Sequence, residues 1–186
     1  MSIHVPDSVF ESKILDKEFH GRLLADLERL SRKAGIPAHY VWSRLAEFCT
    51  EDEIAWVRKM RSDEDHGLII TSSSPTIPVE CKMMAMTGAF LRNYINARML
   101  SVQEVLAMVK ASGGVQPTVA LVPNFSMSKS DSASVAPWES ASLLSWLYSR
   151  LVDGQKTVLF VGSMKTLEEV YGEAMLKHLK THYRIL

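Results

Sequence analysis

The chain contains few cysteines, no excess of either charge and no long apolar run. Cys49 and Cys81 are the only two cysteines and form no C-x-x-C pair, which is typical of a reducing compartment. The 21 basic residues balance the 21 acidic ones, so no overall field attracts nucleic acid. No apolar stretch approaches the roughly 20 residues of a membrane helix, and the first residues lack the pattern of a secretory signal. We therefore expect a soluble, cytoplasmic protein without a membrane partner.

The residues that are present indicate an ordinary globular domain. Apolar residues make up 47% of the 186 positions and charged residues 23%, so long disorder is not expected. Three short apolar runs, 67–71, 118–122 and 157–161, are separated by helical patterns that include 80–96 and 137–152. Continuous apolar runs of this length are typical of strands buried on both faces. The pattern predicts a three-layer α/β fold, in which helices cover both faces of a parallel sheet.

The remaining elements are predicted from periodicity and from capping signals. Thr50 with Glu53, and Ser101 with Glu104, have the spacing of a capping box at the start of a helix. Gly35-Ile36-Pro37 ends the first helix. Further helices are expected over 8–33, 50–62, 101–111 and 166–180, an exposed loop over 126–136, and a last strand over 183–186. This divides the chain into a helical N-terminal extension, 1–33, and an α/β domain, 34–186.

Three segments resemble a known family in their order and spacing. They are Ala34-Gly-Ile-Pro-Ala-His-Tyr40, the strand 67–71 with the loop after it, and Arg150–Ser163 followed by Leu167–Leu179. Together they resemble the replicative-helicase-loader and IstB transposition-helper family of AAA+ proteins. The resemblance covers 34–186 and implies a P-loop-NTPase-like fold, ATP with Mg²⁺ as the family's cofactor, and AAA+ or helicase-type partners.

The phosphate-binding loop departs from the family pattern. A P-loop needs G-x-x-x-x-G-K-[ST], because the glycines let backbone N–H groups surround the phosphates and the hydroxyl binds Mg²⁺. The best match here runs from Thr76 to Met83, and only its Lys82 is retained. Pro78 removes an N–H, and Glu80 adds a negative charge. Lys82 and Ser74 are thus the candidates for a vestigial nucleotide site.

Other catalytic positions of the family are also changed. Where the resemblance implies the Walker B acids, the chain has Pro123-Asn124, which neither binds Mg²⁺ nor polarises water. Ala174 and His178 occupy the positions of the family's arginines, and Ser163 stands at the sensor position. We therefore expect no catalytic residues, no metal, no cofactor and no ATP hydrolysis. The alternative is a loader-like ATPase with a divergent P-loop that still binds ATP and Mg²⁺.

The expected function is that of a non-hydrolysing adaptor in a replication, transposition or mobile-element machine. An exposed apolar stripe usually marks an interface. Phe10, Ile14, Phe19 and Leu23 form such a stripe on the first helix, where little core is left to bury them. They are the predicted partner-binding residues, for an AAA+ or helicase-type protein or for a second copy, with DNA reached through the partner.

Two further hypotheses concern DNA and metal. The basic C-terminal helix could bind DNA directly, and its candidate contacts are Lys165, Lys177, Lys180 and Arg184. His178 and His182 have the i, i+4 spacing that can bind zinc, but no third ligand lies near them in the sequence. Their lysine neighbours favour a solvated basic face instead.

Overall fold

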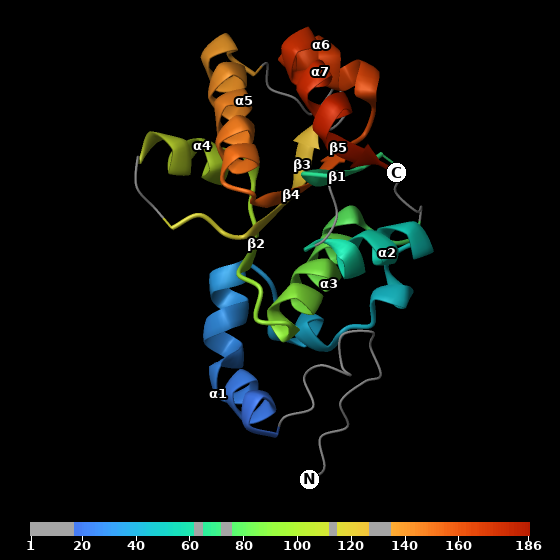
Figure 1. Ribbon diagram of the computed structural model, residues 1–186, viewed down its shortest axis with the longest axis vertical. Coiled ribbons are helices and arrows are strands. Elements are labelled where there is room, and N and C mark those ends of the chain that lie inside the picture. The colour runs from blue at the N-terminus through green and yellow to red at the C-terminus, as the bar shows by residue number, and fades with distance from the viewer. Residues whose placement is uncertain (1–16, 62–64, 72–75, 112–114, 127–134) are drawn as a thin grey trace.

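A five-stranded, all-parallel sheet forms the centre of the protein in the computed structural model, which describes residues 17–61, 65–71, 76–111, 115–126 and 135–186 (Figure 1). The order of the strands across the sheet is β2-β3-β4-β1-β5. The strands are β1 (Gly67–Ile70), β2 (Ala97–Met99), β3 (Val119–Ser126), β4 (Lys156–Val161) and β5 (Tyr183–Ile185).

Seven α-helices and two short 3-10 helices are found in the described residues. The α-helices are α1 (Lys17–Ala34), α2 (Glu51–Lys59), α3 (Val79–Arg92), α4 (Val102–Lys110), α5 (Pro137–Val152), α6 (Met164–Tyr171) and α7 (Glu173–His182), and the 3-10 helices are Ala38–Trp42 and Leu45–Glu47. Within this part of the chain, no helix combines the length and the apolar character needed to cross a bilayer.

The two faces of the sheet are buried by different helices. Side chains alternate along a strand, so Leu68 and Ile70 of β1 pack with α2 and α3, whereas Ile69 packs with the helices α4 to α7. Figure 1 shows α2 and α3 on one side of the strands and α4 to α7 on the other. This confirms the predicted α/β fold with a parallel sheet covered on both faces.

The predicted strands and caps are largely confirmed. The three apolar runs correspond to β1, β3 and β4, which are neighbours and parallel. Thr50 and Ser101 cap α2 and α4 through complete capping boxes with Glu53 and Glu104. The helix expected over 137–152 has those bounds in α5.

Three elements differ from the prediction. The single helix expected over 166–180 is two helices, because Gly172 adopts a φ of 87° between α6 and α7. The helix expected over 80–96 ends at Arg92, and Tyr94 takes a φ of 54°. The three residues of β2 were missed, since so short a strand has no detectable periodicity.

The first helix packs on the body of the protein. α1 contacts α3, β2 and the 3-10 helix Ala38–Trp42, and Leu23 is only 1% exposed. Leu23 therefore contributes to the core, unlike the expectation that it faces a partner. The sequence could not reveal this, because α3 and β2 meet α1 only in the folded chain. Phe10 and Ile14 lie outside the described residues, as does the side chain of Phe19.

Arg150 anchors α5 to the amino ends of two strands. Its buried guanidinium donates to Thr157 Oγ1 at 2.9 Å, to Gln155 Oε1 at 2.9 Å and to the carbonyl oxygen of Pro117 at 3.1 Å. Burial lowers the pKa of Arg150 to about 10, which still leaves it charged at neutral pH. Several hydrogen bonds offset the cost of burying this charge.

Gly88 allows α3 to approach the 3-10 helix Ala38–Trp42 closely. A Cβ at Gly88 would lie 2.1 Å from the carbonyl oxygen of Tyr40. The residue at this position must therefore lack a side chain, although glycine is a poor residue inside a helix.

We predict that Gly88→Ala destabilises the protein, because backbone atoms would have to move to admit the methyl group. Overpacking of this kind typically costs about 1–3 kcal/mol. The matched control is Gly21→Ala in α1, where a Cβ meets nothing within 4 Å and alanine is favoured by roughly 0.5–1 kcal/mol. Urea unfolding of both variants measures the difference. Equal effects would contradict the close packing at Gly88.

Candidate functional site

The topology of the sheet indicates where a ligand site belongs. The connection from β1 runs through α3 toward β2 at one edge, whereas the connection from β4 runs through α6 and α7 to β5 at the other. Adjacent strands whose connections diverge form a topological switch point, and ligands of parallel α/β sheets bind at the carboxyl ends of such strands. The candidate site is therefore the carboxyl edge of β1 and β4.

Neutral side chains occupy the described part of this edge. Thr71 follows β1, Ser126 ends β3, and Gly162 and Ser163 follow β4. The hydroxyl of Thr71 donates to the carbonyl oxygen of Leu186 at 2.9 Å, and the Gly162 amide donates to that of Ser126 at 2.8 Å. The Ser126 hydroxyl is buried without a hydrogen-bond partner. Among the described residues that directly follow these strands, none carries the carboxylate that metal-assisted hydrolysis needs.

Lys82 forms a buried ion pair with Glu53. Its Nζ lies 2.7 Å from Oε1 of Glu53, and both side chains are almost completely buried. Lys82 is in the first turn of α3, and Glu53 is in the first turn of α2. The ion pair therefore joins two helices on one face of the sheet, and the charge of Lys82 is neutralised by a carboxylate of the same chain.

The second carboxylate oxygen of Glu53 also has a partner. Oε2 accepts the Thr50 amide at 2.7 Å, as part of the capping box of α2. Burial, and secondarily the charge of Glu53, raise the pKa of the nearby Cys49 thiol to about 12. Because the thiolate is the reactive form, this raised pKa disfavours Cys49 as a nucleophile at neutral pH.

Of the other expected nucleotide residues, only Ser163 lies in the described part of the chain, and its hydroxyl already has backbone partners. Ser163 caps α6, and its hydroxyl oxygen accepts the Lys165 and Thr166 amides at 3.2 and 3.4 Å. Ser74 lies outside the described residues. Pro123 and Asn124 lie within β3, where its register with β4 shifts between Val122 and Ser126. This placement fits proline, which cannot donate to a neighbouring strand.

Three of the four residues proposed to contact DNA are exposed, and the fourth is held in an ion pair. Lys165, Lys177 and Lys180 are exposed. Arg184 instead forms an ion pair with Asp65, with Nε and Oδ2 2.7 Å apart. The three lysines lie on α6 and α7, so they remain candidates for contact with phosphate groups.

His178 does not lie on a solvated face, which corrects the expectation from its lysine neighbours. It is 3% exposed, and neither ring nitrogen has a hydrogen-bond partner. The fold also brings His66 to the pair, with its ring centroid 5.8 Å from that of His182. Within the described residues, no group of three or more His, Cys, Asp or Glu side chains is arranged to hold a metal ion.

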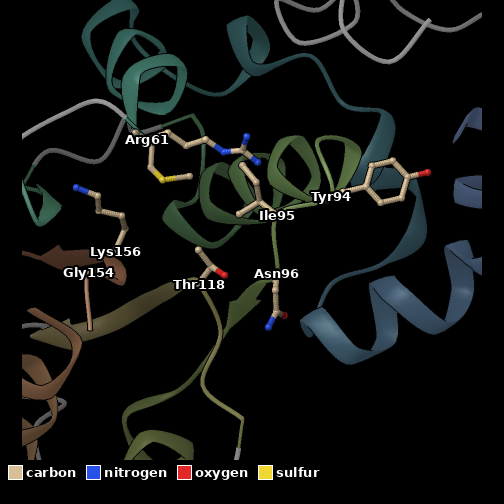
Figure 2. Close-up of a pocket in the computed structure, with 8 residues that line it drawn as sticks. Arg61, Tyr94, Ile95, Asn96, Thr118, Gly154 and Lys156 are labelled. Atoms are coloured by element: carbon tan, nitrogen blue, oxygen red, sulfur yellow. The ribbon is translucent and has the colours of Figure 1, made fainter. Parts of the chain in front are cut away.

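A cavity of about 510 Å³ lies at the opposite, amino edge of the sheet. Asn96, Thr118 and Lys156 line it, directly before or at the start of β2, β3 and β4. Figure 2 shows the Lys156 amine and the Tyr94 ring directed to opposite sides, so these groups do not converge on a ligand. Lys156 Nζ donates to the carbonyl oxygen of Asp65 at 2.7 Å.

The outer face of α5 is exposed and uncharged. Trp138 is 50% exposed, Tyr148 48% and Val152 83%, with the exposed Ala141 and Ser145 between them. We call these five residues the α5 face. The two charged residues of α5 lie elsewhere: Glu139 accepts the Ala136 amide at 2.9 Å, and Arg150 is buried.

Sequence reasoning missed the α5 face. The composition of α5 could have indicated it, because a helix of 16 residues with only two charged side chains has few polar groups to expose to water. One cation from another helix lies beside this face, because Lys110 Nζ of α4 is 4.3 Å from the centroid of the Trp138 ring. Exposed aromatic residues with few charges among them resemble the centre of a protein–protein interface.

Neither protein-family models nor curated protein sequences match this chain. The resemblance of residues 34–186 to helicase loaders thus stays a prediction from motifs.

We predict that Lys82→Met lowers the free energy of unfolding of the nucleotide-free protein by about 3–5 kcal/mol, because it leaves the Glu53 carboxylate buried and unpaired. Glu53→Gln should have a similar effect, and the double variant should regain part of the loss. The control is Arg29→Met in the exposed Arg29–Asp26 pair, where no measurable change is expected.

Denaturant unfolding of the four variants gives the comparison. An unchanged stability of Lys82→Met, together with weaker binding of added nucleotide, would show that Lys82 is a phosphate ligand rather than a structural residue.

Proposed function

We propose that this chain is a non-hydrolysing, AAA+-like adaptor that acts through protein contacts. Its fold is taken to be a degenerate P-loop-NTPase domain, and its partner an AAA+ or helicase-type protein of a replication, transposition or mobile-element machine. The fold family and the type of machine rest on the sequence resemblance. The observation that carries the absence of hydrolysis is the buried ion pair between Lys82 and Glu53.

A lysine that binds ATP must be free to meet the β- and γ-phosphates. To reach a phosphate, Lys82 would have to leave Glu53 and abandon a buried carboxylate, which costs several kcal/mol. The missing P-loop glycines weaken phosphate binding, because fewer backbone N–H groups can surround the phosphates. The neutral Pro123-Asn124 weakens Mg²⁺ binding, because it supplies no carboxylate ligand. These losses are independent of one another, and each disfavours ATP hydrolysis.

The α5 face supports a role in protein contact. Its aromatic residues offer apolar area, and its alanine and serine add no charge that a partner would have to desolvate. Leu23 no longer belongs to the predicted partner-binding stripe, because it is buried. Phe10, Ile14 and Phe19 remain candidates.

Direct DNA binding is the second candidate. The exposed Lys165, Lys177 and Lys180 favour it, since lysines that contact phosphates release counterions from DNA. Three such contacts supply only weak, strongly salt-dependent binding. We therefore place DNA with the partner rather than with this chain.

We predict no measurable ATPase activity and a dissociation constant for Mg-ATP weaker than roughly millimolar, which corresponds to about −4 kcal/mol. Isothermal calorimetry and a phosphate-release assay test this directly. A micromolar dissociation constant would favour the ATP-binding alternative and contradict the adaptor proposal.

We also predict that Ser145→Glu reduces partner binding at least about tenfold, because it places an unpaired charge in the middle of an apolar contact, which costs more than about 1.4 kcal/mol. The matched control is Ala46→Glu, at an exposed position of the 3-10 helix Leu45–Glu47. Affinity capture from the native host with wild type and both variants, followed by mass spectrometry, identifies the partner.

The adaptor proposal requires that the captured proteins include an AAA+ or helicase-type ATPase, and that Ser145→Glu loses it while Ala46→Glu does not. Removal of residues 1–16, with Phe10 and Ile14, tests the N-terminal stripe in the same assay. Retention of the isolated chain on DNA that falls with salt, without any protein partner, would favour the DNA-binding candidate.

A further inference from the structure

Three histidines meet where the C-terminal elements join the sheet. His178 and His182 come from α7, and His66 directly precedes β1. The ring centroids of His178 and His182 are 5.0 Å apart, and those of His66 and His182 are 5.8 Å apart. The backbone amide of His66 donates to the carbonyl oxygen of His182 at 2.9 Å. Segments more than a hundred residues apart in sequence are thus held together at this point.

His178 is the buried member of this cluster. Tyr148 of α5 packs on its ring at a centroid distance of 4.3 Å, and Tyr183 of β5 lies 6.0 Å away. Both of its nitrogens are enclosed and lack hydrogen-bond partners. A neutral imidazole tolerates this position better than a cation, because the cation would bury two unpaired N–H groups instead of one, together with a net charge.

The charged groups around the cluster do not favour protonation. Among the described residues, the cation of Lys156 in β4 acts on His66 and is opposed by Asp65. Asp65 is itself paired with Arg184 of β5. Burial raises the pKa of the Tyr183 phenol to about 12, although Arg150 of α5 lies close enough to oppose this rise. The described groups that face the three rings are therefore mostly neutral or positive.

We infer that His66, His178 and His182 form a proton-sensitive latch, which holds α7 and β5 on β1 while the rings are neutral and releases them when the rings become charged. β5 is one of the two edge strands and, among the described strands, pairs with β1 alone. Directly after β5, the Leu186 amide donates to the carbonyl oxygen of Ile69 in β1 at 2.9 Å. Release leaves β1 as an open edge, which is able to pair with another strand.

The direction of the pH dependence follows from the pKa values. Burial lowers the pKa of His178 from 6.5 to about 4, and the neighbouring His182 and His66 add to this. Burial also lowers the pKa of His66. The closed form therefore binds fewer protons than the released form. The latch is fully stable above about pH 6.5 and weakens as the pH falls toward 4, by up to about tenfold per pH unit from the protonation of His178.

Hydrogen exchange of the full chain from about pH 7.5 to about 4.5, in EDTA and corrected for the intrinsic pH dependence of exchange, tests the inference. The amides of α7, β5 and Leu186 should lose protection by up to about tenfold per pH unit below about 6.5. The amides of β3 and β4 should keep theirs.

Three variants test whether the loss of protection at low pH is due to the histidines of the latch. His178→Phe keeps an aromatic ring but cannot be charged, and it should flatten the pH dependence. His66→Gln serves the same purpose at a less buried position, should His178→Phe fail to fold. His39→Gln is the control, because His39 is exposed and packs on Tyr40, and it should behave as wild type.

Parallel loss of protection in α3, β3 and β4 would mean global acid unfolding and would overturn the latch. So would an unchanged pH profile in both latch variants. A change on adding EDTA alone at about pH 7.5 would show that the histidines bind a metal, which also overturns it.

Discussion

Strands β1, β3 and β4 are buried on both faces over most of their length, which favours apolar side chains there or polar ones with a partner inside the protein. This constraint explains the continuous apolar runs, and it requires a helical layer on each side of the sheet. One layer is formed by α2 and α3, and the other by α4 to α7. Every charged group that the layers enclose must consequently find a partner of the same chain.

Three buried cations show how this requirement is met. Lys82 pairs with Glu53, and Arg150 donates to side chains and carbonyl oxygens at the amino ends of β3 and β4. Arg92, at the end of α3, donates to the carbonyl oxygens of Val41 and Ser43. Each cation joins a helix to another segment. Burial thus directs these charges into structural roles, and the lysine that resembles a nucleotide ligand is one of them.

The helical layer on the other side carries both proposed activities. Tyr148 lies at their junction, because it belongs to the α5 face and also packs on His178. A movement of α7 would change the support of Tyr148, and with it the surface offered to a partner. The contact surface and the histidine latch are therefore physically adjacent.

The sequence by itself determined the elements whose signals are local. The apolar runs of β1, β3 and β4 and the capping boxes at Thr50 and Ser101 are short-range patterns, and the parallel sheet follows from their alternation with helices. The neutral Pro123-Asn124, at the position where the resemblance implies catalytic acids, was likewise visible from the sequence.

Only the tertiary structure decided which distant side chains meet. Glu53 and Lys82 are 29 positions apart, and nothing in the sequence marks them as partners. His66 joins His178, and Leu23 becomes buried, through contacts between segments far apart in the chain. Such contacts depend on how the helices cover the sheet, which is set by the packing of all the layers together rather than by any local pattern.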